Sequence, residues 1–178
     1  MLRTVTTVAL VAVVAVASWW DVRERRIPNA LTVGALVAAL LLRIPGGTGS
    51  VVAGLEGAGI AFGLSLVFFL AGGMGGGDVK LLAAVGAFLG PSRLWPGLLA
   101  MALAGGLMAG WVVVRKGAVP ETAANLRTLL ATFGRKTFTG WKGREGEAAL
   151  TLETPGALTV PYGAAIAVGA LVGWFLGG

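Results

Sequence analysis

The chain has 178 residues, 56% of them hydrophobic and 12% charged, with a mean hydropathy of +0.86 and a net charge of +6. This composition lies outside that of ordinary soluble domains and predicts a membrane protein. Cysteine and histidine are absent, which excludes disulfides, thiolate nucleophiles, histidine general bases and the usual zinc sites. A basic chain can bind nucleic acid, but in one this apolar we expect the cations to set membrane orientation and to contact anionic lipid headgroups instead.

Six apolar stretches predict an all-α fold with six transmembrane helices in a single polytopic domain, at about 4–20, 28–42, 51–71, 79–89, 94–114 and 158–176. The fourth would rise only about 16 Å, against a hydrocarbon core of about 30 Å, so we expect it to start inside the bilayer. Glycine pairs of the GxxxG type predict close helix packing at four places, namely Gly59 with Gly63, Gly86 with Gly90, Gly106 with Gly110, and Gly169 with Gly173.

The distribution of Lys and Arg predicts the orientation. When the six spans are threaded alternately, eleven of the fourteen cations fall on one face and only Arg3, Arg43 and Arg93 on the other. The positive-inside rule assigns the first face to the cytoplasm and places both termini outside. A cleaved signal peptide ending near Ala15–Ala17 is an alternative for the first span, but the positive charge follows that apolar core more than it precedes it.

A long polar segment, about 115–157, carries most of the predicted cytoplasmic charge and is interpreted as a loop. Leu126, Leu129, Leu130 and Phe133 recur within it at helical spacing. This pattern is typical of a helix in the headgroup layer, or equally of an amphipathic helix packed on its own protein.

Only two residues of the chain are aspartates, Asp21 and Asp78, and without histidine or cysteine any chemistry must come from carboxylates. Asp21 ends the first span, where the negative end of the helix dipole does not favour a carboxylate, so capping does not readily explain it. The alternative is an interfacial residue paired with Arg23, Arg25 or Arg26. Glu56 lies near the outer end of the third span and is left out of the site.

Asp78 follows five glycines at positions 72, 73, 75, 76 and 77. Aspartate is a favoured N-cap, so one interpretation is that Asp78 simply starts a helix. Five glycines exceed what a cap requires, however, and backbone without side chains admits another chain closely, such as a substrate. Lys80 either anchors this helix end at the interface or tunes the charge of Asp78.

The strings around both aspartates resemble those of the type IV prepilin peptidases, a family of GxGD intramembrane aspartyl proteases. One string is GGGDVKL, from Gly75 to Leu81, which is similar to the GxGDxKL form, and another is DVRERRIPN, from Asp21 to Asn29, which is similar to DxRxxxIPN. VPYGAAIAVGA, from Val160 to Ala170, is similar to the final span of the family.

The resemblance implies an aspartic endopeptidase in the bacterial cytoplasmic membrane, with Asp21 and Asp78 catalytic and neither metal nor organic cofactor. Two carboxylates that share a site hold one proton between them and supply an acid and a base together. The substrate would be a prepilin or pseudopilin whose basic leader is cut on the cytoplasmic side, with Gly75, Gly76, Gly77 and Lys80 binding the substrate or supporting the loop.

Larger bacterial members of the family carry an additional cytoplasmic region with paired cysteines and also methylate the new N-terminus. This cysteine-free chain resembles instead the short, cleavage-only form found with Flp-type or tight-adherence pili. Two other classes also fit the composition: an ion-coupled transporter with paired intramembrane carboxylates, and a non-enzymatic membrane subunit of a secretion system.

Overall fold

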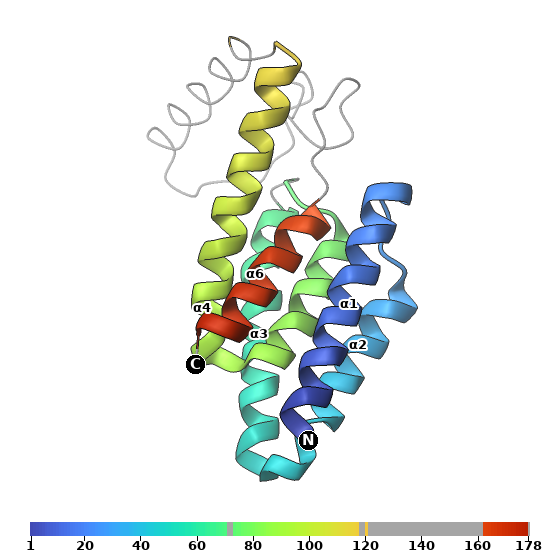
Figure 1. Cartoon of the computed structure of the whole chain (residues 1–178), viewed down its shortest axis with the longest axis vertical. Helices are drawn as coiled ribbons and strands as arrows, with labels where there is room; N and C mark the ends of the chain where they lie inside the picture. Colours follow the sequence, from blue (N-terminus) through green and yellow to red (C-terminus); the bar gives the residue numbers. More distant parts are fainter. Residues whose placement is uncertain (71–72, 118–119, 121–161, 178) are drawn as a thin grey trace. The chain divides into compact units, whose positions relative to one another are not determined.

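The computed structural model describes residues 1–70, 73–117, 120 and 162–177. Over these residues the fold is all-helical, as predicted (Figure 1). In chain order the elements are α1 (Leu2–Glu24), α2 (Asn29–Leu41), the short 3-10 helix η1 (Ile44–Gly46), α3 (Gly47–Leu70), α4 (Gly76–Arg115) and α6 (Tyr162–Leu176).

Three apolar helical stretches in the described part of the chain are long enough to cross a membrane: Leu2–Glu24, Asn29–Leu70 and Gly76–Arg115. The second of these contains α2, η1 and α3. Their hydropathy and length identify a membrane protein, because a stretch of about 20 apolar residues matches the thickness of the hydrocarbon core.

The predicted end of the first helix was wrong, because α1 continues to Glu24 and Asp21 therefore lies inside its last turn and not beyond its end. The predicted separation of helices 79–89 and 94–114 is confirmed, since they are the two arms of α4 and a sharp kink at Gly90, with φ 70° and ψ 173°, divides them. Glycine tolerates this positive φ, and Pro91 tolerates the first position of the following arm because its missing N–H would have no helical partner there.

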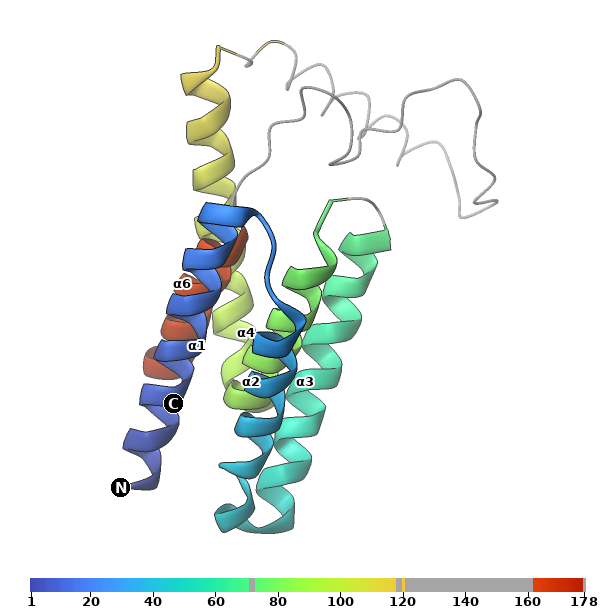
Figure 2. The ribbon, with the colours of Figure 1, turned by 90° about the vertical axis from the view of Figure 1, so that its right-hand side faces the viewer.

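The first arm of α4 forms the centre of the unit that contains the aspartates. Every side chain from Leu81 to Leu89 is buried, Phe88 and Leu81 being the largest. A helix that is apolar on all sides is expected to be surrounded by other helices. The first arm of α4 descends in the view of Figure 1 and the chain then turns back into the second arm, which both views show (Figures 1 and 2). The turn is the kink at Gly90.

Helices α1 and α6 lie side by side in antiparallel orientation (Figures 1 and 2). Ser18 Oγ donates to Gly163 O at 3.0 Å at one end of the pair, and Trp174 Nε1 donates to Thr7 Oγ1 at 2.9 Å at the other. The start of α1 and the end of α6 therefore lie at the end of this helix pair opposite to the last turn of α1, which contains Asp21.

Two of the four predicted glycine pairs contribute to close packing. Gly86 is packed against the backbone of Gly57 in α3, and Gly169 and Gly173 approach the backbone of Gly97 and Arg93 in the second arm of α4. The predictions for Gly59 with Gly63 and for Gly106 with Gly110 were wrong, since a Cβ at any of these four glycines would meet no atom of the described chain within 4 Å. Glycine spacing alone does not show which face of a helix meets a neighbour.

Arg43 fastens the far end of the first arm of α4. Its Nε donates to Ala87 O at 2.7 Å and its Nη2 to Phe88 O at 3.0 Å, while Nη1 donates to Ser50 O at 3.0 Å. The last carbonyls before the break at Gly90 have no helical partner, so the guanidinium satisfies groups that would otherwise be left unpaired.

Residue contacts divide the chain into two compact units, one of Met1–Gly106 with Pro161–Gly178 and the other of Leu107–Val160. In the second unit the described residues are the end of α4, where Arg115 stacks over Trp111 at 4.7 Å, and the few that follow it. Most of the predicted loop 115–157, including its amphipathic segment, lies outside the described residues. The single-domain organisation stays a prediction.

Candidate active site

Asp21 is held in the last turn of α1 with its side chain only 8% exposed. Arg25 caps the C-terminus of this helix, since it takes a left-handed conformation (φ 52°) and donates its N–H to Asp21 O at 3.0 Å. The carboxylate Oδ2 accepts the N–H of Gly163, in the first turn of α6, at 2.7 Å. A backbone donor from another helix therefore fixes one oxygen of this carboxylate.

Asp78 lies in the first turn of α4, which begins two residues earlier at Gly76. Its Oδ2 accepts the N–H of Gly75 at 3.3 Å, and its own N–H donates to Gly75 O at 3.1 Å. The first bond is the side-chain half of a capping box, in which Asp78 reaches back to the N–H of Gly75, and the second is an ordinary backbone turn bond, so Asp78 is the third residue of the helix and not the N-cap.

Capping explains only one oxygen of Asp78. The other, Oδ1, is buried and has no hydrogen-bond partner among the described residues. A buried polar atom without a partner costs about 1–3 kcal/mol, so its presence asks for an explanation outside stability. An acceptor held ready for a water molecule or a substrate is such an explanation.

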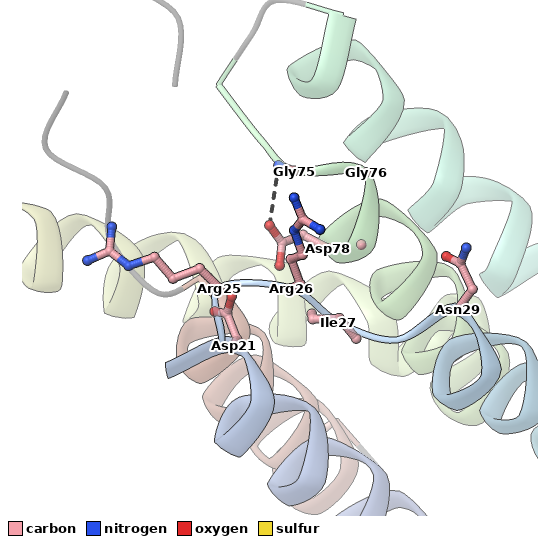
Figure 3. A pocket seen from close by; sticks show the side chains of 9 residues that line it. Asp21, Arg25, Arg26, Ile27, Asn29, Gly75, Gly76 and Asp78 are labelled. Atoms are coloured by element: carbon pink, nitrogen blue, oxygen red, sulfur yellow. Dashed lines mark hydrogen bonds between the residues drawn. The ribbon is translucent and has the colours of Figure 1, made fainter. Parts of the chain in front are cut away.

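The two aspartates line one pocket of about 270 Å³. The close-up in Figure 3 shows their carboxylates entering it from α1 and from α4, and they are near enough to interact electrostatically. The remaining lining residues come from the α1–α2 connection and the glycine-rich segment: Arg25, Arg26, Ile27, Asn29, Gly75, Gly76 and Gly77. The structure thus brings together the two residues that sequence reasoning singled out.

Two glycines beside Asp78 permit a close approach of chain segments. A Cβ at Gly77 would lie 3.2 Å from Ile27 Cβ in the α1–α2 connection, and a Cβ at Gly75 would lie 3.0 Å from Asp78 Oδ2. At Gly76 the nearest atom, in the Phe69 ring, would be 3.5 Å away, an ordinary contact. Backbone without side chains does allow another segment to approach here, as expected. The segment that approaches is Ile27 of the protein's own α1–α2 connection.

Lys80 contacts a different residue from the one the sequence pointed to. Its Nζ donates to Asn29 Oδ1 at 2.8 Å, which joins the first turn of α4 to the first residue of α2 (Asn29 is labelled in Figure 3). Asn29 and Gly163 were noticed only as members of motif strings, and sequence reasoning gave neither of them a role. Two features of the sequence could have indicated these residues. Asn29 is a polar residue in the string that contains Asp21, and Gly163 is a residue without a side chain in the final motif string.

The acidic residues that line the pocket are the two aspartates. In the described part of the chain no cluster of three or more His, Cys, Asp or Glu side chains has metal-ligand spacing. A pair of neighbouring carboxylates that are themselves buried can still hold a shared proton and activate a water molecule.

Fold and pocket together define an all-helical membrane protein with a paired-aspartate site at the helix ends. Residues 8–113 match the type IV leader peptidase family. Because this is more than half of the chain and spans Asp21 and Asp78, the chain belongs to that family, which confirms the resemblance and assigns a leader-peptidase role in general terms. A search of curated proteins found no match, and neither did a search of solved structures.

Proposed function

We propose that the protein is a membrane-embedded aspartic endopeptidase that removes the basic leader from type IV prepilin-like or pseudopilin precursors at the cytoplasmic face of the bacterial inner membrane. The observation that carries the proposal is the opening of Asp21 and Asp78 into one pocket. Family membership supports peptidase chemistry, and a pair of aspartates is the simplest set of groups that performs it without histidine or cysteine.

In the proposed reaction the ionised aspartate takes a proton from a water molecule, and the resulting hydroxide bonds to the scissile carbonyl carbon. The protonated aspartate donates to the developing oxyanion. Collapse of the tetrahedral intermediate breaks the C–N bond, and the nitrogen leaves with a proton returned by the dyad. The partnerless Oδ1 of Asp78 supports this scheme because it can accept a hydrogen bond from the attacking water.

The proposed topology has six crossings: α1, α2, α3, the two arms of α4, and α6. The excess of Lys and Arg places the aspartate end at the cytoplasm and both termini outside. Trp19 supports placing the aspartate end of the helices at the membrane surface. Its side chain is 64% exposed, and the guanidinium of Arg23, one helical turn later, stacks over its ring at 5.7 Å. Tryptophan and arginine at a helix end are typical of the headgroup level, where a substrate's basic leader meets its apolar segment.

The proposal is tested by co-expressing the protein with a prepilin and comparing Asp21→Asn with Asp78→Asn. Each variant should abolish leader removal while the amount inserted in the membrane is unchanged. Glu56→Gln, at an exposed carboxylate of α3, is the matched control and should process the substrate normally. Cleavage retained by either aspartate variant would exclude the dyad, and proton or sodium flux that both variants abolish would favour a transporter.

The resemblance of this cysteine-free sequence to the cleavage-only form supports cleavage without methylation. The new N-terminus of the processed pilin should therefore carry no methyl group when its mass is measured after co-expression with this protein alone. A methylated product formed under these conditions would contradict the assignment to the cleavage-only form.

A further inference from the structure

Gly163, in the first turn of α6, contacts both Asp21 and Ser18 of α1. Its N–H donates to Asp21 Oδ2 at 2.7 Å, and its carbonyl accepts Ser18 Oγ at 3.0 Å, one helical turn earlier on α1. The N–H groups of a helix's first turn have no partner within the helix. Here the N–H of Gly163 donates to the carboxylate, so the hydrogen-bonding needs of this N–H and of Asp21 Oδ2 are met together.

Position 163 has no room for a side chain. A Cβ there would lie 2.9 Å from Asp21 Cβ, 3.0 Å from its Oδ2 and 3.2 Å from its Cγ. An added methyl group would push the carboxylate from its place or lift α6 from α1. Gly163 has a helical backbone conformation that any residue can adopt, so its conformation does not require glycine. The closeness of Asp21 does.

Other contacts, remote from Gly163, hold the rest of α6 against its neighbours. Trp174 Nε1 donates to Thr7 Oγ1 at the far end of the α1–α6 pair. On another side, a Cβ at Gly169 would lie 2.5 Å from Gly97 O, so the helix backbone rests against the second arm of α4. Because α6 is held at several points, its first turn is a rigid support for a side chain.

We propose that Ser18 and Gly163 are positioning residues of the peptidase, which hold Oδ2 of Asp21 so that the carboxylate stays directed into the pocket shared with Asp78. This inference rests on the proposed function, because it presumes that Asp21 is catalytic. The family match ends at residue 113 and so does not cover Gly163, whose contact with Asp21 is observed in the structure.

The test measures kcat and KM of the purified, membrane-reconstituted protein on a prepilin substrate. Ser18→Ala removes the hydroxyl that holds the Gly163 carbonyl and should lower kcat about tenfold, with KM unchanged. Ser18→Thr keeps the hydroxyl and should recover most of that loss. Gly163→Ala displaces the carboxylate and should lower kcat about a hundredfold.

Two matched controls separate positioning from stability. Trp174→Phe removes the hydrogen bond at the other end of the same helix pair, and should lower the thermal unfolding temperature while kcat per folded molecule is unchanged. Gly63→Ala makes the same substitution as Gly163→Ala in a helix where the new Cβ meets no described atom within 4 Å. It should leave kcat and unfolding unchanged.

The inference is overturned if Ser18→Ala keeps its full kcat per folded molecule, or if Trp174→Phe lowers kcat as much as Ser18→Ala does. It is also overturned if Ser18→Thr is no better than Ser18→Ala. These results leave the proposed function intact as long as Asp21→Asn is inactive. An active Asp21→Asn enzyme refutes the proposed function itself, and with it the inference.

Discussion

Lys80 Nζ donates a hydrogen bond of 2.8 Å to Asn29 Oδ1, although the two residues are 51 positions apart. Each belongs to the string that carries one of the aspartates, so this contact ties the start of α4 to the start of α2. Between them, the Ile27 backbone lies against Gly77. The pair therefore holds the two halves of the pocket together.

This contact predicts energetic coupling between Lys80 and Asn29. Lys80→Ala and Asn29→Ala should each lower the rate of leader cleavage about three- to tenfold. The double variant should be little worse than either single variant, because the second substitution removes a group whose partner is already gone. A double-mutant cycle on cleavage rates measures this, and losses that multiply would show that the two residues act independently.

Arg43 is predicted to stabilise the fold away from the pocket. Arg43→Ala should reduce the free energy of unfolding by about 2–4 kcal/mol, since three carbonyl oxygens lose a charged donor. Denaturant unfolding in detergent micelles measures the change. Arg3→Ala, at an exposed cation near the N-terminus, serves as the control and should change it little; an equal effect of both substitutions would argue against the role given to Arg43.

The packing of α3 against the first arm of α4 predicts different effects for two glycines of α3. Gly57→Ala should destabilise the protein by about 1–3 kcal/mol, because a Cβ there would overlap the backbone of Gly86. Gly59→Ala, two residues further along the same helix, meets no described atom within 4 Å and should be neutral or slightly stabilising. Unfolding measurements compare the two, and equal effects would show that this interface is not the one in the folded protein.

The glycine-rich segment predicts a graded series of cleavage rates. Gly77→Ala should reduce leader cleavage more than Gly76→Ala does, because its Cβ would press on Ile27 whereas a Cβ at position 76 meets only an ordinary contact with Phe69. The measurement is the fraction of prepilin processed at equal enzyme levels. A reversed order would mean that substrate contacts, and not the protein's own packing, require these glycines.

Much of the fold followed from local patterns in the chain. Long apolar stretches are sufficient to predict membrane helices, because the bilayer leaves few other ways to satisfy the backbone. The absence of histidine and cysteine left carboxylates as the groups able to carry chemistry, and the strings around Asp21 and Asp78 indicated the family that the match at residues 8–113 confirmed. The break in α4 was visible only as a gap between two apolar stretches, and its sharp turn depends on a positive φ at Gly90.

The site itself depended on contacts between segments far apart in the chain. Hydropathy and helical periodicity describe one segment at a time, so they cannot show that Asp21 and Asp78 open into one pocket, or that Gly163 rather than a nearby arginine supplies a donor to Asp21 Oδ2. The same reason explains why Gly59 with Gly63 was taken for a packing pair: spacing places two glycines on one face of a helix, and only the packed helices decide which face has a neighbour.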